Sequence, residues 1–301
     1  MTRQLVFVHG RAQEQKNSIA LKAEWIDALN DGLTKSNLTL PIAEHDIRFP
    51  FYGDTLYDMS AGKSADEAAK VVVRGENADD DERRFTRAIM EEIRKNTGIT
   101  EAQLIEVGGQ NVVTKGPLNW EWFQTLLQAV DRFVPFGSGA AIALFTSDVY
   151  QYLKNSVIRA TIDSGVRAAL TPGLETVVVA HSLGTVVAYN LLRQQGQQLG
   201  WKVPLFVTVG SPLAITEIRR TLKNFAPTRC PECVTKWFNA MDERDVVALY
   251  PLDTDYFPID PANPAIENKR DVRNKTRNRH GIAGYLNDAE VARRIHEALV
   301  A

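Results

Sequence analysis

Cysteine is scarce in this chain. Only two of the 301 residues are cysteines, Cys230 and Cys233, and they form a single C-P-E-C motif. A structural zinc site needs four ligands, and one CxxC pair with no second pair supplies half of them. We therefore expect two thiols in a loop before a strand and no metal site. A redox role for the pair is the alternative.

The chain also lacks a charge imbalance and a long apolar run. Its 35 basic and 37 acidic residues give a net charge of -2, which offers no overall attraction for nucleic acid or an anionic membrane. The absence of a run of about 18 apolar residues argues against a membrane span. Met1–Gln4 leads directly into the apolar Leu5–Val8, which leaves no room for an export signal. We expect a soluble, cytoplasmic protein without a nucleic-acid partner or transmembrane segment; peripheral membrane contact and oligomeric state stay open.

The most informative stretch that is present runs from Val177 to Thr185. Its β-branched start predicts a strand buried on both faces, and the apolar spacing that follows predicts a helix. Ser182 stands at the turn between them. Such a turn is crowded, and Ala180 and Gly184 are the small residues that it needs. The backbone N–H of Leu183 is then free at the first turn of the helix, where negative charge is favoured.

The segment Ala180-His181-Ser182-Leu183-Gly184 resembles the G-x-S-x-G nucleophile elbow of the α/β-hydrolases, in their lipase and esterase branch, with alanine in place of the first glycine. The resemblance implies an α/β fold with a mostly parallel central sheet, Ser182 as the nucleophile and the N–H of Leu183 in an oxyanion hole. The alternative is a buried serine that caps an ordinary strand-to-helix turn.

The first predicted strand, Leu5–Val8, ends in His9-Gly10-Arg11. This pattern is similar to the segment that supplies the second oxyanion donor in α/β-hydrolases, where glycine lets the backbone approach the substrate. The resemblance implies that Gly10 and the N–H of Arg11 complete the oxyanion hole. We expect His9 to pack or hydrogen-bond beneath the site.

A serine nucleophile needs a histidine base, and the chain has five histidines. In a strand, the side chain of His181 points away from the neighbouring serine. His9 and His45 precede the serine, and His296 falls within the last predicted helix. His280 follows the last predicted strand in a glycine-containing loop, so it is the predicted base, with an exposed loop histidine as the alternative.

The acid that orients the base should follow the strand predicted at 234–240. Asp242 and Asp245 both stand there. The stretch Trp237–Asn239 followed by Asp245-Val246 is similar to the W-x-N and D-x-V segments of lipase-like hydrolases. The resemblance implies that Asp245 is the acid and that Asp242 forms a turn.

Strand-like segments near residues 5, 43, 177, 204 and 235 alternate with helical patterns, which favours a parallel sheet. We expect a single α/β-hydrolase domain over residues 1–301, with a largely helical cap or lid inserted at 53–170. A β-hairpin is predicted from Leu104–Val107 to Val112-Val113.

Four aromatic residues are candidate walls of a substrate pocket. Phe51 and Tyr52 follow the strand predicted at Ile42–Phe49, at the end of the sheet where ligands bind in open α/β folds. Trp120 and Trp122 begin an aromatic helical segment of the insertion. Ordinary packing is the alternative for all four.

These observations predict a serine hydrolase that cleaves the carboxylic ester of a small molecule or lipid through an acyl-enzyme on Ser182. No cofactor or metal is implied. A peptidase, amidase or thioesterase would use the same machinery, and a non-catalytic binding protein would keep the same fold. The basic run 269–279 before His280 is either a solvated loop or a rim that attracts an anionic substrate.

Overall fold

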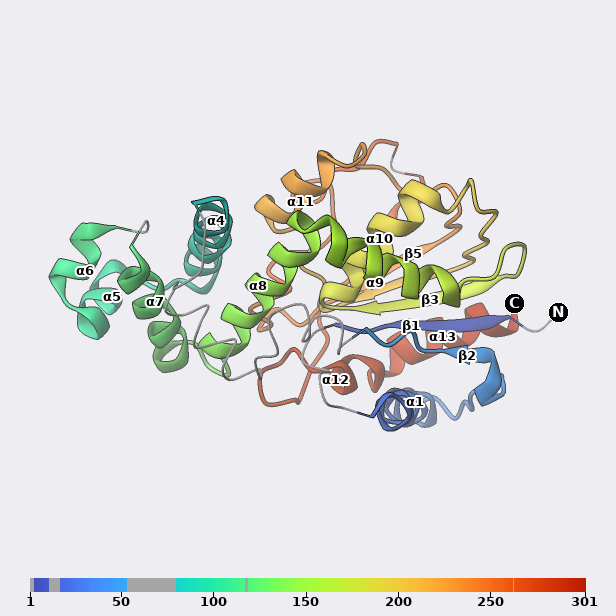
Figure 1. The fold of residues 1–301 in the computed structure, drawn as a ribbon. Helices are drawn as coiled ribbons and strands as arrows, with labels where there is room; N and C mark the ends of the chain where they lie inside the picture. The colour runs from blue at the N-terminus through green and yellow to red at the C-terminus, as the bar shows by residue number, and fades with distance from the viewer. Residues whose placement is uncertain (1–2, 11–16, 53–79, 117–118, 262) are drawn as a thin grey trace.

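The computed structural model describes residues 3–10, 17–52, 80–116, 119–261 and 263–301. At its centre lies a six-stranded parallel sheet of order β2-β1-β3-β4-β5-β6 (Figure 1). The predicted α/β class with a parallel sheet is confirmed. The strands are β1 (Gln4–Val8), β2 (Ile47–Arg48), β3 (Thr176–His181), β4 (Phe206–Val209), β5 (Trp237–Ala240) and β6 (Ile266–Lys269).

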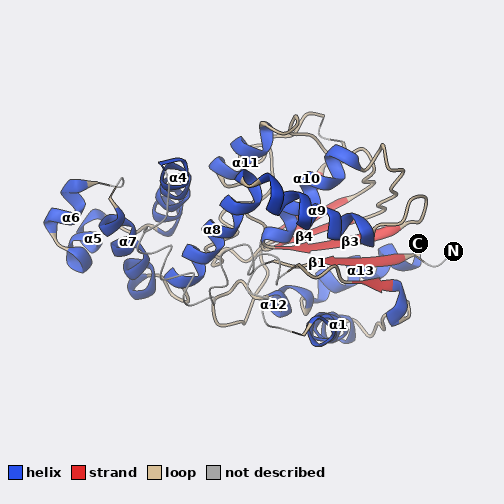
Figure 2. Ribbon diagram, in the orientation of Figure 1, coloured by secondary structure: helices blue, strands red, loops and turns tan. Residues whose placement is uncertain are grey.

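Helices cover both faces of the sheet (Figure 2). Val177 and Val179 of β3 pack into one apolar cluster with helices α1 (Ser18–Thr34) and α13 (Ala289–Val300). Val178 and Ala180 face the other cluster, which includes α10 (Leu183–Gln195) and α11 (Thr216–Lys223). Burial on both faces is the reason why this strand has no polar alternation.

Between β2 and β3 the structure describes helices α4 (Asp80–Thr97), α5 (Glu101–Gly108), α6 (Gln110–Lys115), α7 (Trp120–Phe133), α8 (Gly139–Lys154) and α9 (Ser156–Ala169). Helices α8 and α9 pack against α10, whereas α5, α6 and α7 contact one another and project away from the sheet (Figure 1). The first part of the predicted insertion, 53–79, lies outside the described residues.

The hairpin predicted around residue 109 is wrong, because this segment forms α5 and α6. The Thr100 side chain accepts the N–H of Gln103, and the Gln103 side chain accepts the N–H of Thr100. This capping box starts α5. Gly109, at φ 82°, separates the two helices in a conformation that favours glycine.

The strand order reverses beside β1. The chain places β2 on one side of β1 and then returns to place β3 on the other side. In open parallel sheets a crevice opens beyond the carboxyl ends of the strands at such a reversal. Gly10, after β1, and Ser182, after β3, therefore meet at this point.

Across the described residues, no helix combines the length and the apolar character needed to cross a membrane.

Candidate active site

Ser182 occupies a strained turn between β3 and α10. Its φ of 54° and ψ of -128° are unusual for a residue with a side chain. The end of β1 packs tightly against this turn: a Cβ added to Gly184 would lie 2.2 Å from the carbonyl oxygen of Val8, and one added to Gly10 would lie 2.7 Å from the Cβ of Ser182. Only glycine fits at either position without movement of the backbone or of Ser182.

The turn brings Ser182 into hydrogen-bond contact with a histidine far away in the sequence. His280 Nε2 lies 2.8 Å from Ser182 Oγ, and His280 Nδ1 lies 2.7 Å from Asp245 Oδ2. The three residues follow β3, β5 and β6, whose carboxyl ends lie at the same edge of the sheet. The Asp245 side chain has no exposed surface and Ser182 is buried. We call Ser182, His280 and Asp245 the serine network.

Asp242, the other candidate acid, is engaged elsewhere. Its carboxylate accepts a hydrogen bond from Arg244 Nε at 2.8 Å and from the N–H of Asn274 at 2.8 Å. Burial alone would raise the pKa of Asp242, but these hydrogen bonds outweigh it and hold the pKa below its usual value. The structure therefore places Asp245 beside His280 and gives Asp242 a role in holding the 242–244 turn and the 274 segment.

Asp245 has further donors that the sequence patterns do not reveal. Its Oδ1 accepts the N–H of Val247 at 2.9 Å, and its Oδ2 accepts the hydroxyl of Tyr285 at 2.6 Å. Tyr285 is fully buried on α12 (Ile282–Leu286). Burial, and then the negative charge of Asp245, raise the pKa of Tyr285 well above its usual value. The phenol therefore stays protonated and donates.

Among the described residues, no hydrogen bond joins His181 to the Ser182 hydroxyl. His181 instead contacts the backbone of the loop that carries His280. Its Nε2 lies 2.7 Å from the carbonyl oxygen of His280. Burial, and then the neighbouring His280, lower the pKa of His181 well below its usual value. The ring is therefore neutral, and Nε2–H donates to the carbonyl. This contact had no signal in the sequence, because the two residues are 99 positions apart.

His9 lies beneath the Gly10 turn, as expected. Its Nδ1 lies 2.7 Å from the carbonyl oxygen of Gly10, and its Nε2 accepts the N–H of Tyr52 at 3.1 Å. Its ring stacks on Tyr52, with a centroid separation of 3.9 Å. Burial lowers the pKa of His9 to about 4, so the ring is neutral near pH 7. These contacts fix the backbone that faces Ser182.

Two backbone N–H groups were predicted as oxyanion donors. Leu183 is the first residue of α10, so its N–H has no acceptor within the helix and points out of the helix end. Gly10 lies against Ser182. Arg11, which was to supply the second donor, lies outside the described residues.

The four predicted pocket-wall residues fall into two separate places. Tyr52 is buried against His9, and Phe51 also packs on the His9 ring, near the end of β1. Trp120 and Trp122 lie at the start of α7 and line a small hollow beside α4. None of the residues of the serine network lines that hollow.

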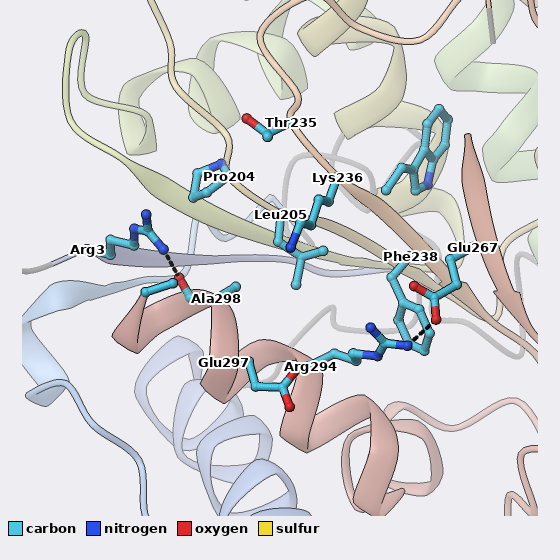
Figure 3. A pocket seen from close by; sticks show the side chains of 12 residues that line it. Arg3, Pro204, Leu205, Thr235, Lys236, Phe238, Glu267, Arg294, Glu297 and Ala298 are labelled. Atoms are coloured by element: carbon cyan, nitrogen blue, oxygen red, sulfur yellow. Dashed lines mark hydrogen bonds and ion pairs between the residues drawn. The ribbon is translucent and has the colours of Figure 1, made fainter. Parts of the chain in front are cut away.

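A larger hollow, of about 340 Å³, lies at the opposite end of the sheet (Figure 3). It is lined by residues that precede the strands, such as Arg3 and Lys236, and by the last turns of α13. Arg3 donates to Glu175 and to the carbonyl of Ala298, and Arg294 pairs with Glu267. These arginines are already paired, so the hollow has no arrangement of groups comparable to the serine network.

Cys230 and Cys233 are free, buried thiols. Burial raises the pKa of Cys230 to about 11 and that of Cys233 to about 12. A reactive thiol needs the opposite shift, so the pair has the character of packed side chains. Among the described residues, no three His, Cys, Asp or Glu side chains gather as metal ligands would.

No protein-family model, curated protein or solved structure matches this chain. Its function must therefore be inferred from the geometry of the serine network.

Proposed function

We propose that the chain is an α/β-hydrolase that cleaves carboxylic esters through an acyl-enzyme on Ser182. The observation that carries this proposal is the unbroken series of hydrogen bonds from Ser182 Oγ through both ring nitrogens of His280 to the buried Asp245. A serine hydroxyl becomes a nucleophile when a neutral histidine takes its proton, and the carboxylate holds the histidine in the required tautomer.

In the proposed reaction, Ser182 Oγ attacks the ester carbonyl while its proton moves to His280 Nε2. The carbon–oxygen bond of the leaving alcohol then breaks, and the same proton goes to the departing oxygen. Water repeats the two steps and releases the acid. The carboxylate of Asp245 stabilises the imidazolium that forms in each step.

The negative charge on the carbonyl oxygen needs donors that are already in place. The N–H of Leu183, at the positive end of α10, is the first proposed donor. By resemblance to other α/β-hydrolases, the second is the N–H of Arg11, and Gly10 leaves room for the substrate above Ser182.

The fold supports the same proposal. A nucleophile in a strained strand-to-helix turn, at the carboxyl edge of a parallel sheet, followed in the chain by the acid and then the histidine, is typical of α/β-hydrolases. The helices between β2 and β3 are proposed to form the cap, of which α8 and α9 lie against the nucleophile helix.

The first prediction tests the nucleophile and the base together. Ser182→Ala and His280→Ala should each lower hydrolysis of p-nitrophenyl butyrate by about 10⁶-fold, because the two groups act as a unit. The parent should react with a fluorophosphonate probe, and Ser182→Ala should not. Circular dichroism and thermal unfolding of each variant serve as the control for folding.

Turnover of p-nitrophenyl butyrate by Ser182→Ala at the parent rate would overturn the proposal. A parent that neither hydrolyses esters nor reacts with fluorophosphonate would instead favour a binding protein that keeps the fold. If the probe reacts but esters are poor substrates, amide and thioester panels separate the remaining hydrolase classes.

A further inference from the structure

Tyr285 contacts the serine network directly, although it touches neither Ser182 nor His280 through a hydrogen bond. Its hydroxyl donates to Asp245 Oδ2 at 2.6 Å, and the same oxygen accepts His280 Nδ1–H at 2.7 Å. The phenol oxygen also accepts the N–H of Asp242 at 3.4 Å. Two donors therefore share one oxygen of a carboxylate that has no exposed surface.

We propose that Tyr285 is a positioning residue that limits how strongly Asp245 stabilises the charged form of His280. This inference rests on the proposed function and deepens it. Each hydrogen bond donated to the carboxylate withdraws part of its negative charge. The Tyr285 hydroxyl thereby weakens the attraction between Asp245 Oδ2 and a protonated His280 ring.

The backbone of His280 is held by contacts that do not involve the Tyr285 hydroxyl. The His280 carbonyl accepts from His181, and its N–H donates to Asn278 Oδ1 at 3.2 Å. These two contacts hold the histidine backbone on both sides. Removal of the hydroxyl should therefore change the charge on Asp245 and leave the histidine in place.

The ring of Tyr285 is held by packing around Gly210. This glycine is the first residue after β4 and has a φ of 56°. An added Cβ would lie 3.0 Å from Tyr285 Cε2, 3.3 Å from His181 Cδ2 and 3.3 Å from His280 Cε1. The three rings thus close around a residue without a side chain. A phenylalanine at position 285 can keep the same ring contacts.

Among the described residues, the neighbouring groups Asp242 and His181 keep one charge state near neutral pH. Asp242 is paired with Arg244, and hydrogen bonds from Arg244 hold its pKa low against the effect of burial. His181 is neutral because burial lowers its pKa. A shift in the pH profile after substitution of Tyr285 therefore reports on Asp245 and His280.

The test compares two tyrosine-to-phenylalanine variants. Tyr285→Phe removes the hydroxyl at Asp245. Tyr152→Phe is the matched control, because Tyr152 is equally buried and donates to the carboxylate of Asp163 at 2.9 Å. The kcat/KM for p-nitrophenyl butyrate is measured against pH at the isosbestic wavelength of the product. We expect the acid limb to move to higher pH by about 0.5 unit in Tyr285→Phe and to stay in place in Tyr152→Phe.

A third variant covers the case in which Tyr285→Phe fails to fold. 3-Fluorotyrosine at position 285 keeps the hydroxyl and makes it a stronger donor, so the acid limb should move to lower pH. An acid limb that coincides with that of the parent in either variant at position 285 overturns this inference. Activity in Ser182→Ala would instead overturn the proposed function, so the two failures are distinguishable.

Discussion

At the scale of single residues, the two aspartates after β5 have different contacts. Asp245 is hydrogen-bonded to His280, whereas Asp242 is hydrogen-bonded to Arg244 within its own turn. We predict that Asp245→Asn lowers kcat by about 10⁴-fold, because an amide can no longer hold His280 in the tautomer that accepts the Ser182 proton. Asp242→Asn should leave kcat within a few-fold of the parent, since its carboxylate contacts Arg244 and Asn274. Steady-state hydrolysis of p-nitrophenyl butyrate measures both. The reverse ranking would move the acid to Asp242.

Because burial lowers the pKa of His9 and His181, we expect the free energy of unfolding to depend on pH. The pKa of His9 is about 4 in the folded chain, whereas its ordinary value is 6.5. Between pH 4 and 6.5, His9 is therefore protonated in the unfolded chain and neutral in the folded chain. The stabilising effect of neutral His9 is fully present above pH 6.5 and is lost as the pH falls towards 4. We expect this residue alone to remove about 3 kcal/mol over that range.

Guanidinium unfolding at several pH values between about 7 and 4 measures this effect. In His9→Asn, the loss of stability on acidification should be smaller than in the parent, although the variant starts from a lower value. Burial also lowers the pKa of His181, so the variant should keep part of the dependence of unfolding free energy on pH. Parallel curves for parent and variant would show that His9 does not titrate as inferred.

Residues with local signals could be predicted, and residues whose role depends on distant contacts could not. Ser182 follows an apolar strand and is flanked by small residues, which is a pattern within nine positions. Tyr285 contacts Asp245 across 40 positions, and its pattern is that of any buried aromatic. Nothing in a single sequence marks such a pairing, because it arises only when the loop after β5 and helix α12 meet at the edge of the sheet.

At the scale of elements, the contact between the end of β1 and the start of α10 sets a strict size limit at Gly184. A methyl group there would meet the carbonyl oxygens of Val8 and His9, at 2.2 and 2.5 Å, and backbone atoms cannot yield cheaply. We predict that Gly184→Ala lowers the free energy of unfolding by about 3 kcal/mol.

Gly165 is the matched control for this substitution. It lies within α9, and an added Cβ would have no neighbour within 4 Å. Gly165→Ala should raise the free energy of unfolding by about 0.5–1 kcal/mol, because alanine loses less backbone entropy in a helix. Urea denaturation measures both variants. Equal effects of the same sign would contradict the tight contact between β1 and α10.

The elements that sequence patterns predicted are the long or strongly apolar ones. The aromatic helical segment predicted to begin at Trp120 corresponds to α7, and the last predicted helix, which contains His296, corresponds to α13. Strand β6 was not predicted, because Ile266–Lys269 is a partly exposed edge with charged and polar residues. The hairpin prediction was wrong because it relied on two short apolar runs. The capping box formed by Thr100 and Gln103 favours a helix in this segment.

At the scale of the whole molecule, the structure divides the basic run before His280 into paired and unpaired cations. Lys269 contacts Asp271, and Arg270 contacts Asp253. Arg279 donates to the carbonyl of Asn274 and lies over the Phe136 ring at 3.7 Å. The exposed cations without an ion pair within the described part of the chain are Arg273, Lys275 and Arg277.

Of these three cations, Arg277 lines a hollow on the surface. It lines a hollow of about 690 Å³ together with Thr276, Asn278 and the turn between α7 and α8. Asn278 is hydrogen-bonded to the backbone of His280. An anionic ester that approaches the serine network along this side would pass within the field of Arg277, although Asp131 in the same lining reduces that attraction.

We therefore predict that Arg273→Ala/Arg277→Ala lowers kcat/KM for p-nitrophenyl hemiglutarate, which is anionic, by about five-fold at low salt and leaves the value for neutral p-nitrophenyl butyrate unchanged. The difference should fade at about 0.5 M salt, where screening removes long-range attraction.

Lys202→Ala/Lys236→Ala is the control, because it removes the same charge from exposed positions before β4 and β5, at the opposite end of the sheet. If both double variants lose the same factor, net charge governs the approach of the substrate and the loop before His280 has no special part in it. If neither loses activity towards the anionic ester, the basic run is a solvated loop.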